Sequence, residues 1–240
     1  MKRSARYLNS KALNDEIRRA SASISIYGCN GQRYIGCGLK DKCVTLYGTP
    51  GNALGAYLDG ALIQVHGNAQ DAVGDTMNDG AIVIHGHAGD TLGYAMRGGC
   101  IYVSGNAGYR TGIHMKEYQD KKPVIMIGGQ AGSFLGEYQA GGTIIVTGLG
   151  LDPALPLVGA FTGSGMHGGK IFIRTASPLK GLSDQVAARS ACAEDMAEIM
   201  PHLLAFSYHF CIDATELLQS PYQVLSPLTR NPYHQLYVAN

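Results

Sequence analysis

The sequence predicts a mainly β fold: a single-stranded, right-handed parallel β-helix of about seven to eight turns, with small helical caps at its N- and C-terminal ends. The first observation behind this prediction is a glycine repeat. Leading glycines fall 19 residues apart at positions 48, 67, 86 and 105, and after a five-residue insertion the interval returns between Gly129 and Gly148. A tandem period of this length is typical of a solenoid, in which each repeat forms one turn.

The second observation is a short alternating run before each leading glycine. The first and third positions of these four-residue runs are Ile, Val or Leu, whereas the second and fourth positions vary. Eight runs share the pattern and begin at Ile24, Val44, Ile63, Ile82, Ile101, Ile125, Ile144 and Ile171. Period-two alternation indicates a half-buried strand. So short a strand buries its apolar face only when copies stack, which gives a ladder of aliphatic side chains about 4.8 Å apart.

The third observation is a further inward ladder in the segments that link the runs. One repeat position holds Leu54, Val73, Leu92 and Leu135, and another holds Leu58, Met77, Met96 and Met115. The recurring pattern Gly-x-x-Gly-x-x-x-Gly suits corners, because glycine reaches positive φ and lets the next turn approach closely. A repeat of 19 residues is too short for a strand with a full crossover helix. A disordered glycine-rich linker would not keep aliphatic residues at fixed positions.

Residues 1–22 are expected to form an N-terminal cap, because the end of a solenoid exposes an apolar surface that needs a cover. Asn9 or Ser10 can begin a short helix there. The apolar face of that helix consists of Leu13, Ile17 and Ala20. The β-helix is expected to occupy residues 23–176.

An insertion interrupts the repeat at residues 116–123, with the sequence Lys-Glu-Tyr-Gln-Asp-Lys-Lys-Pro. It is the one dense charge cluster within the repeats. An insertion in a single turn projects from the wall of a solenoid and is often placed for contact. We therefore expect either a loop that binds a partner or a solvated loop.

Residues 177–240 form the helical C-terminal segment and an extended tail. Ser183 is expected to cap a helix over residues 184–200, which Pro201 then interrupts. A second, more apolar helix is expected over residues 202–212, and Asp213 can cap a short third one. The tail from residue 221 is rich in proline and tyrosine and looks extended. These helices are expected to cover the open end of the coil, or to form an arm that reaches another protein chain.

Composition excludes several classes of function. The chain has 240 residues and a net charge of +1, so no strong field points to nucleic acid. The N-terminus lacks an apolar signal segment, and no apolar run reaches the roughly 18 residues of a membrane span. The six cysteines contain no Cys-x-x-Cys pair, which favours reduced thiols in the cytoplasm.

Candidate sites for chemistry are few. Residues 163–168 match Gly-x-Gly-x-x-Gly, but a strand follows them where a dinucleotide site requires a helix. His66 and His85 share one outward repeat position with His87 close by, which gives a surface ladder or, less simply, a zinc site. The spacing of Cys29, Cys37 and Cys43 differs from that of iron–sulfur clusters. We therefore assign no catalytic, cofactor-binding or metal-binding residue.

The repeats resemble the GXGXG domain at the C-terminal end of the glutamate synthase large subunit, in a stand-alone form. The stretches that carry the resemblance are residues 30–36 (Asn-Gly-Gln-Arg-Tyr-Ile-Gly), 67–71 (Gly-Asn-Ala-Gln-Asp), 93–99 (Gly-Tyr-Ala-Met-Arg-Gly-Gly) and 112–118 (Gly-Ile-His-Met-Lys-Glu-Tyr). It covers roughly residues 5–175. The repeats also resemble those of the C-type component of formylmethanofuran dehydrogenase. The insertion and the ending at residues 232–237 favour the glutamate synthase type.

The resemblance implies a right-handed parallel β-helix without catalytic residues of its own. It further implies a non-catalytic subunit in an assembly that makes glutamate from glutamine and 2-oxoglutarate, with glutaminase and FMN- and iron–sulfur-containing synthase subunits as partners. The alternatives are a scaffold of a formylmethanofuran dehydrogenase, like its C-type component, or of another oxidoreductase complex, a self-associating scaffold that forms homo-oligomers, and an enzyme in its own right. No nucleic acid or membrane partner is expected.

Overall fold

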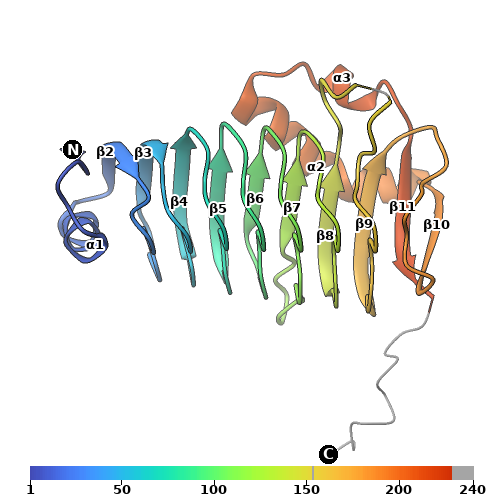
Figure 1. Ribbon diagram of the computed structural model, residues 1–240, viewed down its shortest axis with the longest axis horizontal. Coiled ribbons are helices and arrows are strands. Elements are labelled where there is room, and N and C mark those ends of the chain that lie inside the picture. The colour runs from blue at the N-terminus through green and yellow to red at the C-terminus, as the bar shows by residue number, and fades with distance from the viewer. Residues whose placement is uncertain (153, 229–240) are drawn as a thin grey trace, which may run out of the picture.

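The computed structural model describes residues 1–152 and 154–228, and its strands lie side by side in a long β-solenoid of about eight turns (Figure 1). The strands are β1 (Lys2–Ser4), β2 (Ser23–Asn30), β3 (Cys43–Thr49), β4 (Asp59–His66), β5 (Asp79–Ile84), β6 (Cys100–Val103), β7 (Val124–Ile127), β8 (Ala140–Val146), β9 (Gly168–Arg174), β10 (Val186–Ser190) and β11 (Tyr222–Pro227). The helices are α1 (Ser10–Arg19), α2 (Ala193–Phe210) and α3 (Ala214–Leu218). The predicted fold class is confirmed.

One sheet of 11 strands runs the length of the molecule in the order β1 to β9, then β11 and β10. Strands β1 to β9 are parallel, and β11 and β10 are added antiparallel at the far end. The predicted rung positions lie directly over one another, in the order Ile24, Val44, Ile63, Ile82, Ile101, Ile125, Ile144 and Ile171. The stacking that the alternating runs predict is therefore confirmed.

A second wall of the coil is a shorter ladder of small residues, four alanines and one valine. Isolated parallel bridges link Ala69, Ala88, Ala107, Ala131 and Val158 in successive turns. The linking-segment ladders fill the space between this wall and the sheet, and Leu54, Leu92, Met77 and Met96 have no exposed surface. Small residues on one wall leave room for the long aliphatic side chains of the other, and both sets are buried inside the coil.

The glycines of the repeat serve two separate purposes. The third glycine of each unit is left-handed, as in Gly55 with φ of +64°, and a Cβ there would lie 2.6 Å from Cδ1 of Ile82. The middle glycine does not have positive φ, but a Cβ on Gly51 would overlap the carbonyl oxygen of Gly31 in the preceding turn. Close approach between turns therefore accounts for more of the glycines than backbone conformation does.

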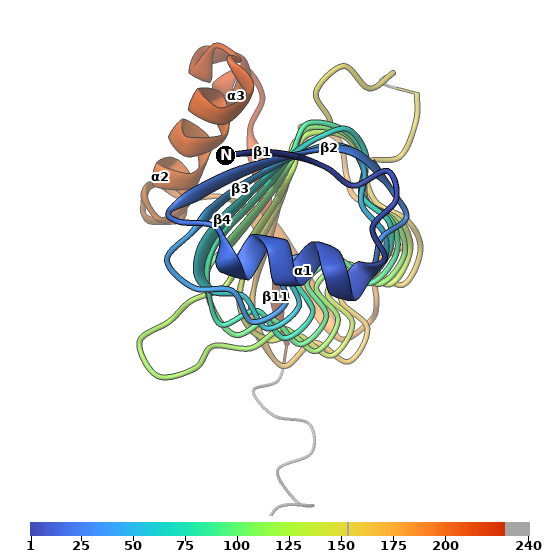
Figure 2. The same ribbon diagram turned by 90° about the vertical axis from the view of Figure 1, so that its left-hand side faces the viewer.

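Helix α1 lies across the open N-terminal end of the coil (Figure 2). Asn9 caps it by accepting a hydrogen bond from the Ala12 amide at 2.9 Å, as the sequence predicts. The buried Asn14 side chain donates to the carbonyl of Tyr34 and accepts from the amide of Gly36, so it joins the helix to the first turn. Strand β1, which the sequence did not indicate, pairs with β2 and completes this cover.

Two predictions for the C-terminal segment are wrong. Strand β10 occupies part of the range where a helix was expected, because residues 186–190 pair with β11, and the Ser183 hydroxyl accepts from the Gln185 amide rather than capping a helix. Helix α2 continues through Pro201 instead of ending there. Asp213 caps the third helix as predicted, since its carboxylate accepts from the Thr215 amide. The rest of the expected extended tail, residues 229–240, lies outside the described residues.

Helix α2 does not cover the end of the coil but lies along the outer face of the sheet (Figure 1). Its buried residues include Ile199, Leu203 and Phe206. They pack with the second residues of five successive runs, Val83, Tyr102, Met126, Ile145 and Phe172. The equivalent positions in β2, β3 and β4 are Ser25, Thr45 and Gln64. The helix therefore covers the part of the face where these positions are apolar.

Candidate functional site

Each turn carries residues in the left-handed backbone conformation at its corner, with φ between 50° and 62°. One column consists of Tyr34, Ala53, Ala72, Thr91, Arg110, Phe134 and Phe161, and a second consists of Tyr57, Thr76, Ala95, His114 and Tyr138. Bulky residues rarely adopt this conformation, because Cβ crowds the backbone. Aromatic side chains at these positions therefore need an explanation beyond the turn itself.

Side chains at these positions in the later turns, together with the neighbouring Tyr109, make up a patch that we call the aromatic corner. It consists of Tyr109, Arg110, His114, Phe134, Tyr138 and Phe161. The rings of Phe134 and Phe161 stack at 5.1 Å, and the Arg110 guanidinium lies 5.0 Å from the centre of the Phe134 ring. His114 and Tyr138 stack at 5.1 Å. Phe161 is 58% exposed and Tyr109 is 56% exposed, so this patch faces solvent.

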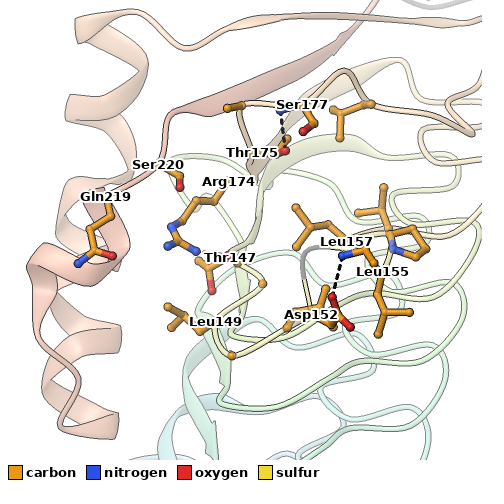
Figure 3. A pocket seen from close by; sticks show the side chains of 18 of the residues that line it. Thr147, Leu149, Asp152, Leu155, Leu157, Arg174, Thr175, Ser177, Gln219 and Ser220 are labelled. Carbon is orange, nitrogen blue, oxygen red and sulfur yellow. Dashed lines mark hydrogen bonds between the residues drawn. The ribbon is translucent and has the colours of Figure 1, made fainter.

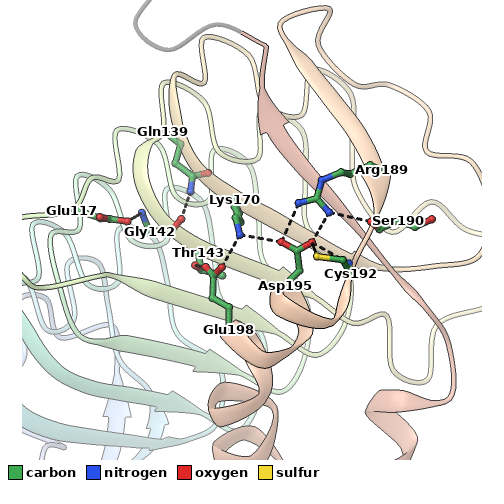
Figure 4. A network of polar contacts seen from close by, with 10 residues as sticks. All are labelled: Glu117, Gln139, Gly142, Thr143, Lys170, Arg189, Ser190, Cys192, Asp195 and Glu198. Atoms are coloured by element: carbon green, nitrogen blue, oxygen red, sulfur yellow. Dashed lines mark hydrogen bonds and ion pairs between the residues drawn. The ribbon is translucent and has the colours of Figure 1, made fainter.

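A polar clamp holds the start of α2 on the sheet (Figure 4). The buried Asp195 carboxylate pairs with Arg189 of β10 and accepts from Nζ of Lys170 of β9 at 3.0 Å. Glu198 also binds Lys170, at 2.7 Å. Hydrogen bonds from Arg189, with further ones from Cys192 and Lys170, hold the pKa of Asp195 far below its usual value. The clamp is charge-balanced and structural, because every charged group in it has a partner.

The insertion at residues 116–123 forms a loop that projects from the wall, as predicted (Figure 2). Tyr118 and Lys121 pair across a tight antiparallel turn. Lys121 donates to Asp79 at 2.7 Å, and Glu117 accepts from the Gly142 amide at 3.2 Å. The loop is thus attached to other turns of the coil, while the Tyr118 ring stays half exposed.

His66 and His85 form part of a surface ladder, which is one of the two arrangements predicted for them. Tyr27, Tyr47, His66 and His85 stack in sequence at 4.5, 4.8 and 4.5 Å, and the ladder ends edge-on against Phe210 of α2. His87 lies apart, where its Nδ1 accepts from the Asn106 amide. Within residues 1–152 and 154–228, no group of three metal-binding side chains comes together.

The other sequence candidates are dispersed. The stretch 163–168 leads into β9 rather than into a helix. All six cysteines are free thiols. Cys29 is the buried one among the three N-terminal cysteines, and burial raises its pKa to about 11.

A cleft of about 830 Å³ opens near the C-terminal end of the solenoid (Figure 3). Its walls are residues 147–152 and 154–158, residues 174–180, and the end of α3 with Gln219 and Ser220. Nη1 of Arg174 donates to the Thr147 carbonyl at 2.7 Å, and the buried Nε of the same side chain has no hydrogen-bond partner among the residues that the structure describes. Leu149, Leu155 and Leu157 supply apolar surface. The arrangement can hold a small molecule that is both anionic and apolar.

Sequence reasoning missed both the aromatic corner and the cleft. A signal for the corner was present, because Arg110, Phe134 and Phe161 follow their turn glycines at one repeat position. For the cleft no comparable signal existed, since two loops of irregular length and a helix end form it.

Known proteins resemble this chain in sequence or in fold. Over 215 residues the chain is 42% identical to an uncharacterized protein of Methanocaldococcus jannaschii, covering 86% of this chain and 82% of that one. One chain in the crystal structure of the formyltransferase/hydrolase complex (FhcABCD) from Methylorubrum extorquens, in complex with methylofuran, has a similar fold. Its TM-score is 0.63 at 23% identity, over 85% of this chain and 72% of that chain.

In the described part of the chain, no helix combines the length and apolar character that a bilayer crossing requires. The model of the GXGXG motif family matches residues 4–201. That match spans most of the solenoid and the first half of α2, and the chain therefore belongs to the GXGXG motif family.

Proposed function

We propose that this chain is a scaffold subunit of a multi-subunit complex of the formyltransferase/hydrolase kind, which holds catalytic partners without reacting itself. The fold shared with a chain of such a complex supports the proposal. A cytoplasmic complex also fits the six free thiols.

The observation that carries the proposal is the aromatic corner. Aromatic residues and arginine are enriched where proteins bind one another. Here Phe134 and Phe161 adopt left-handed backbone conformations while Phe161 is largely exposed. Such a conformation costs about 1 kcal/mol or more for each residue, and an exposed ring regains little of it by burial. A partner chain that covers the rings would offset that cost.

A second candidate is a subunit of a glutamate synthase assembly, in contact with glutaminase and with FMN- and iron–sulfur-containing synthase chains. Residues 93–99 and 112–118 favour it through their resemblance to that enzyme. His114, within the second of these stretches, is part of the aromatic corner. Both candidates therefore use the same surface and differ in the identity of the partners.

The test is purification of the tagged chain from its native organism, followed by identification of the chains that remain bound. Recovery of formyltransferase/hydrolase chains supports the first candidate, and recovery of glutaminase and synthase chains supports the second. Recovery of the chain alone as a homo-oligomer rejects both and favours a self-associating scaffold.

Substitution tests the surface. The double variant Phe134→Asn, Phe161→Asn is expected to lose most of its bound partners and keep its melting temperature, because asparagine tolerates the left-handed conformation. The matched control, Tyr34→Asn with Tyr57→Asn, changes two exposed residues of the same conformation outside the patch. Retention of partners by the first variant would reject the aromatic corner as the docking surface.

A further inference from the structure

The cleft near the end of the solenoid contains the guanidinium of Arg174, which forms no ion pair with any carboxylate in the described part of the chain. Arg174, the last residue of β9, donates from Nη1 to the Thr147 carbonyl, while its buried Nε has no hydrogen-bond partner within residues 1–152 and 154–228. Among the described residues, no Asp or Glu forms an ion pair with this guanidinium, in contrast to Arg189, which binds Asp195. A partly buried charge without a counter-ion is unfavourable, and a bound anion relieves it.

The acidic residues that line the cleft do not supply that counter-ion. Asp152 uses its carboxylate to accept from the Ala154 amide within its own turn. Glu216 lies on the exposed side of α3. Lys180 adds a second cation to the lining. The guanidinium points into the space between Thr147 and Gln219 (Figure 3).

The rest of the lining is aliphatic. Leu149 lies below Arg174, and Leu155 and Leu157 form the opposite wall (Figure 3). Leu155 is 52% exposed, so half of its apolar surface is available to a ligand. The cleft volume of about 830 Å³ lies within the range of about 300–1,000 Å³ that small-molecule sites occupy.

We propose that this cleft binds a small amphipathic carboxylate, whose charged head lies against Arg174 and whose aliphatic body lies on the leucines. Gln219 and Ser220 offer polar groups beside the head. The site is separate from the aromatic corner, so the proposal stands or falls independently of the scaffold function. With this site, the scaffold chain would bind a small molecule in addition to its protein partners.

Titration calorimetry with octanoate, octanol and acetate tests the proposal on the full chain. Octanoate is expected to bind about ten-fold or more tightly than octanol, which lacks the charge, or acetate, which lacks the aliphatic body. Arg174→Gln is expected to weaken octanoate by about ten-fold or more, and Leu155→Ser is expected to weaken it while leaving Arg174 in place.

Arg33→Gln, a change at an exposed arginine far from the cleft in the first turn, is the matched control and is expected to bind octanoate as the unaltered protein does. Thermal unfolding of each variant shows whether it is folded. The proposal is overturned if octanoate does not bind, if it binds no better than octanol, or if both folded cleft variants bind it unchanged.

Discussion

Replacing Gly55 by alanine, and Gly38 by alanine for comparison, separates the two reasons why the repeat needs glycine: positive φ and close approach between turns. Gly55 has φ of +64°, and a Cβ there would lie 2.6 Å from Cδ1 of Ile82, a fully buried rung. Gly38 has nearly the same conformation, φ of +63°, and apart from its two chain neighbours no described residue lies within 4 Å of the added Cβ. Gly38→Ala therefore adds backbone strain alone, whereas Gly55→Ala adds strain and overlap.

The expected magnitudes follow from these two terms. Left-handed strain costs roughly 1 kcal/mol at either position. Overpacking against a rung adds about 1–3 kcal/mol at Gly55, so Gly55→Ala is expected to cost about 2–4 kcal/mol in total. For a chain of this size each kcal/mol lowers the melting temperature by about 2–4 °C. Gly55→Ala should then melt several degrees below Gly38→Ala.

A double-mutant cycle identifies the contact responsible. Ile82→Val removes Cδ1, the atom that the new methyl group would meet, at its own cost of about 0.5–1.5 kcal/mol. With both substitutions the loss should be smaller than the sum of the single losses by about 1 kcal/mol or more. Urea unfolding measures all four proteins. Equal losses at Gly55 and Gly38, or strict additivity with Ile82, would refute the stacked-rung explanation.

Three further predictions concern α2. Asp195→Asn should lower the free energy of unfolding by about 1.5–3 kcal/mol, because it removes the negative charge that Arg189 and Lys170 share. Urea unfolding at neutral pH measures this loss, and an unchanged urea midpoint would contradict a stabilising role for the clamp. Burial lowers the pKa of both His202 and His209, so the folded state binds a proton at these imidazoles less readily than the unfolded chain does. Stability should therefore fall as the pH drops below about 6.5, and a flat pH profile would contradict this. His202→Gln should flatten that profile in part, as urea midpoints at about pH 5 and pH 7.5 would reveal; an equally steep profile would exclude a contribution from His202.

The solenoid was predictable because its residues repeat. Ile63 and Ile82 occupy the same repeat position and pair with each other in neighbouring strands, so one alternating run predicts the next. A strand of four residues buries its apolar side by stacking on its copies. The end caps do not repeat. Residues 184–200 contain many helix-forming residues, yet Val186 and its neighbours pair with β11, the strand that covers the last rung by pairing Leu225 with Ile171. Strand pairing with a segment distant in sequence therefore outweighs the local helix propensity of these residues.

The place of α2 could have been inferred from the second positions of the runs. They change from polar in β4, at Gln64, to apolar in β5, at Val83, and remain apolar as far as Phe172. An apolar outer face on an otherwise solvated sheet requires a cover. The cleft at Arg174 had no such signal, since its partners are set by loop paths that the sequence pattern does not determine.

Hydrogen–deuterium exchange on the purified native complex, compared with the free chain, tests the scaffold role most directly. If partner subunits dock on the aromatic corner, backbone amides in residues 109–114 and 134–138 should exchange more slowly in the complex. Residues 53–57, which form the same kind of corner in an early turn, should exchange equally in both states. Unchanged exchange at the aromatic corner in an intact complex would contradict the account.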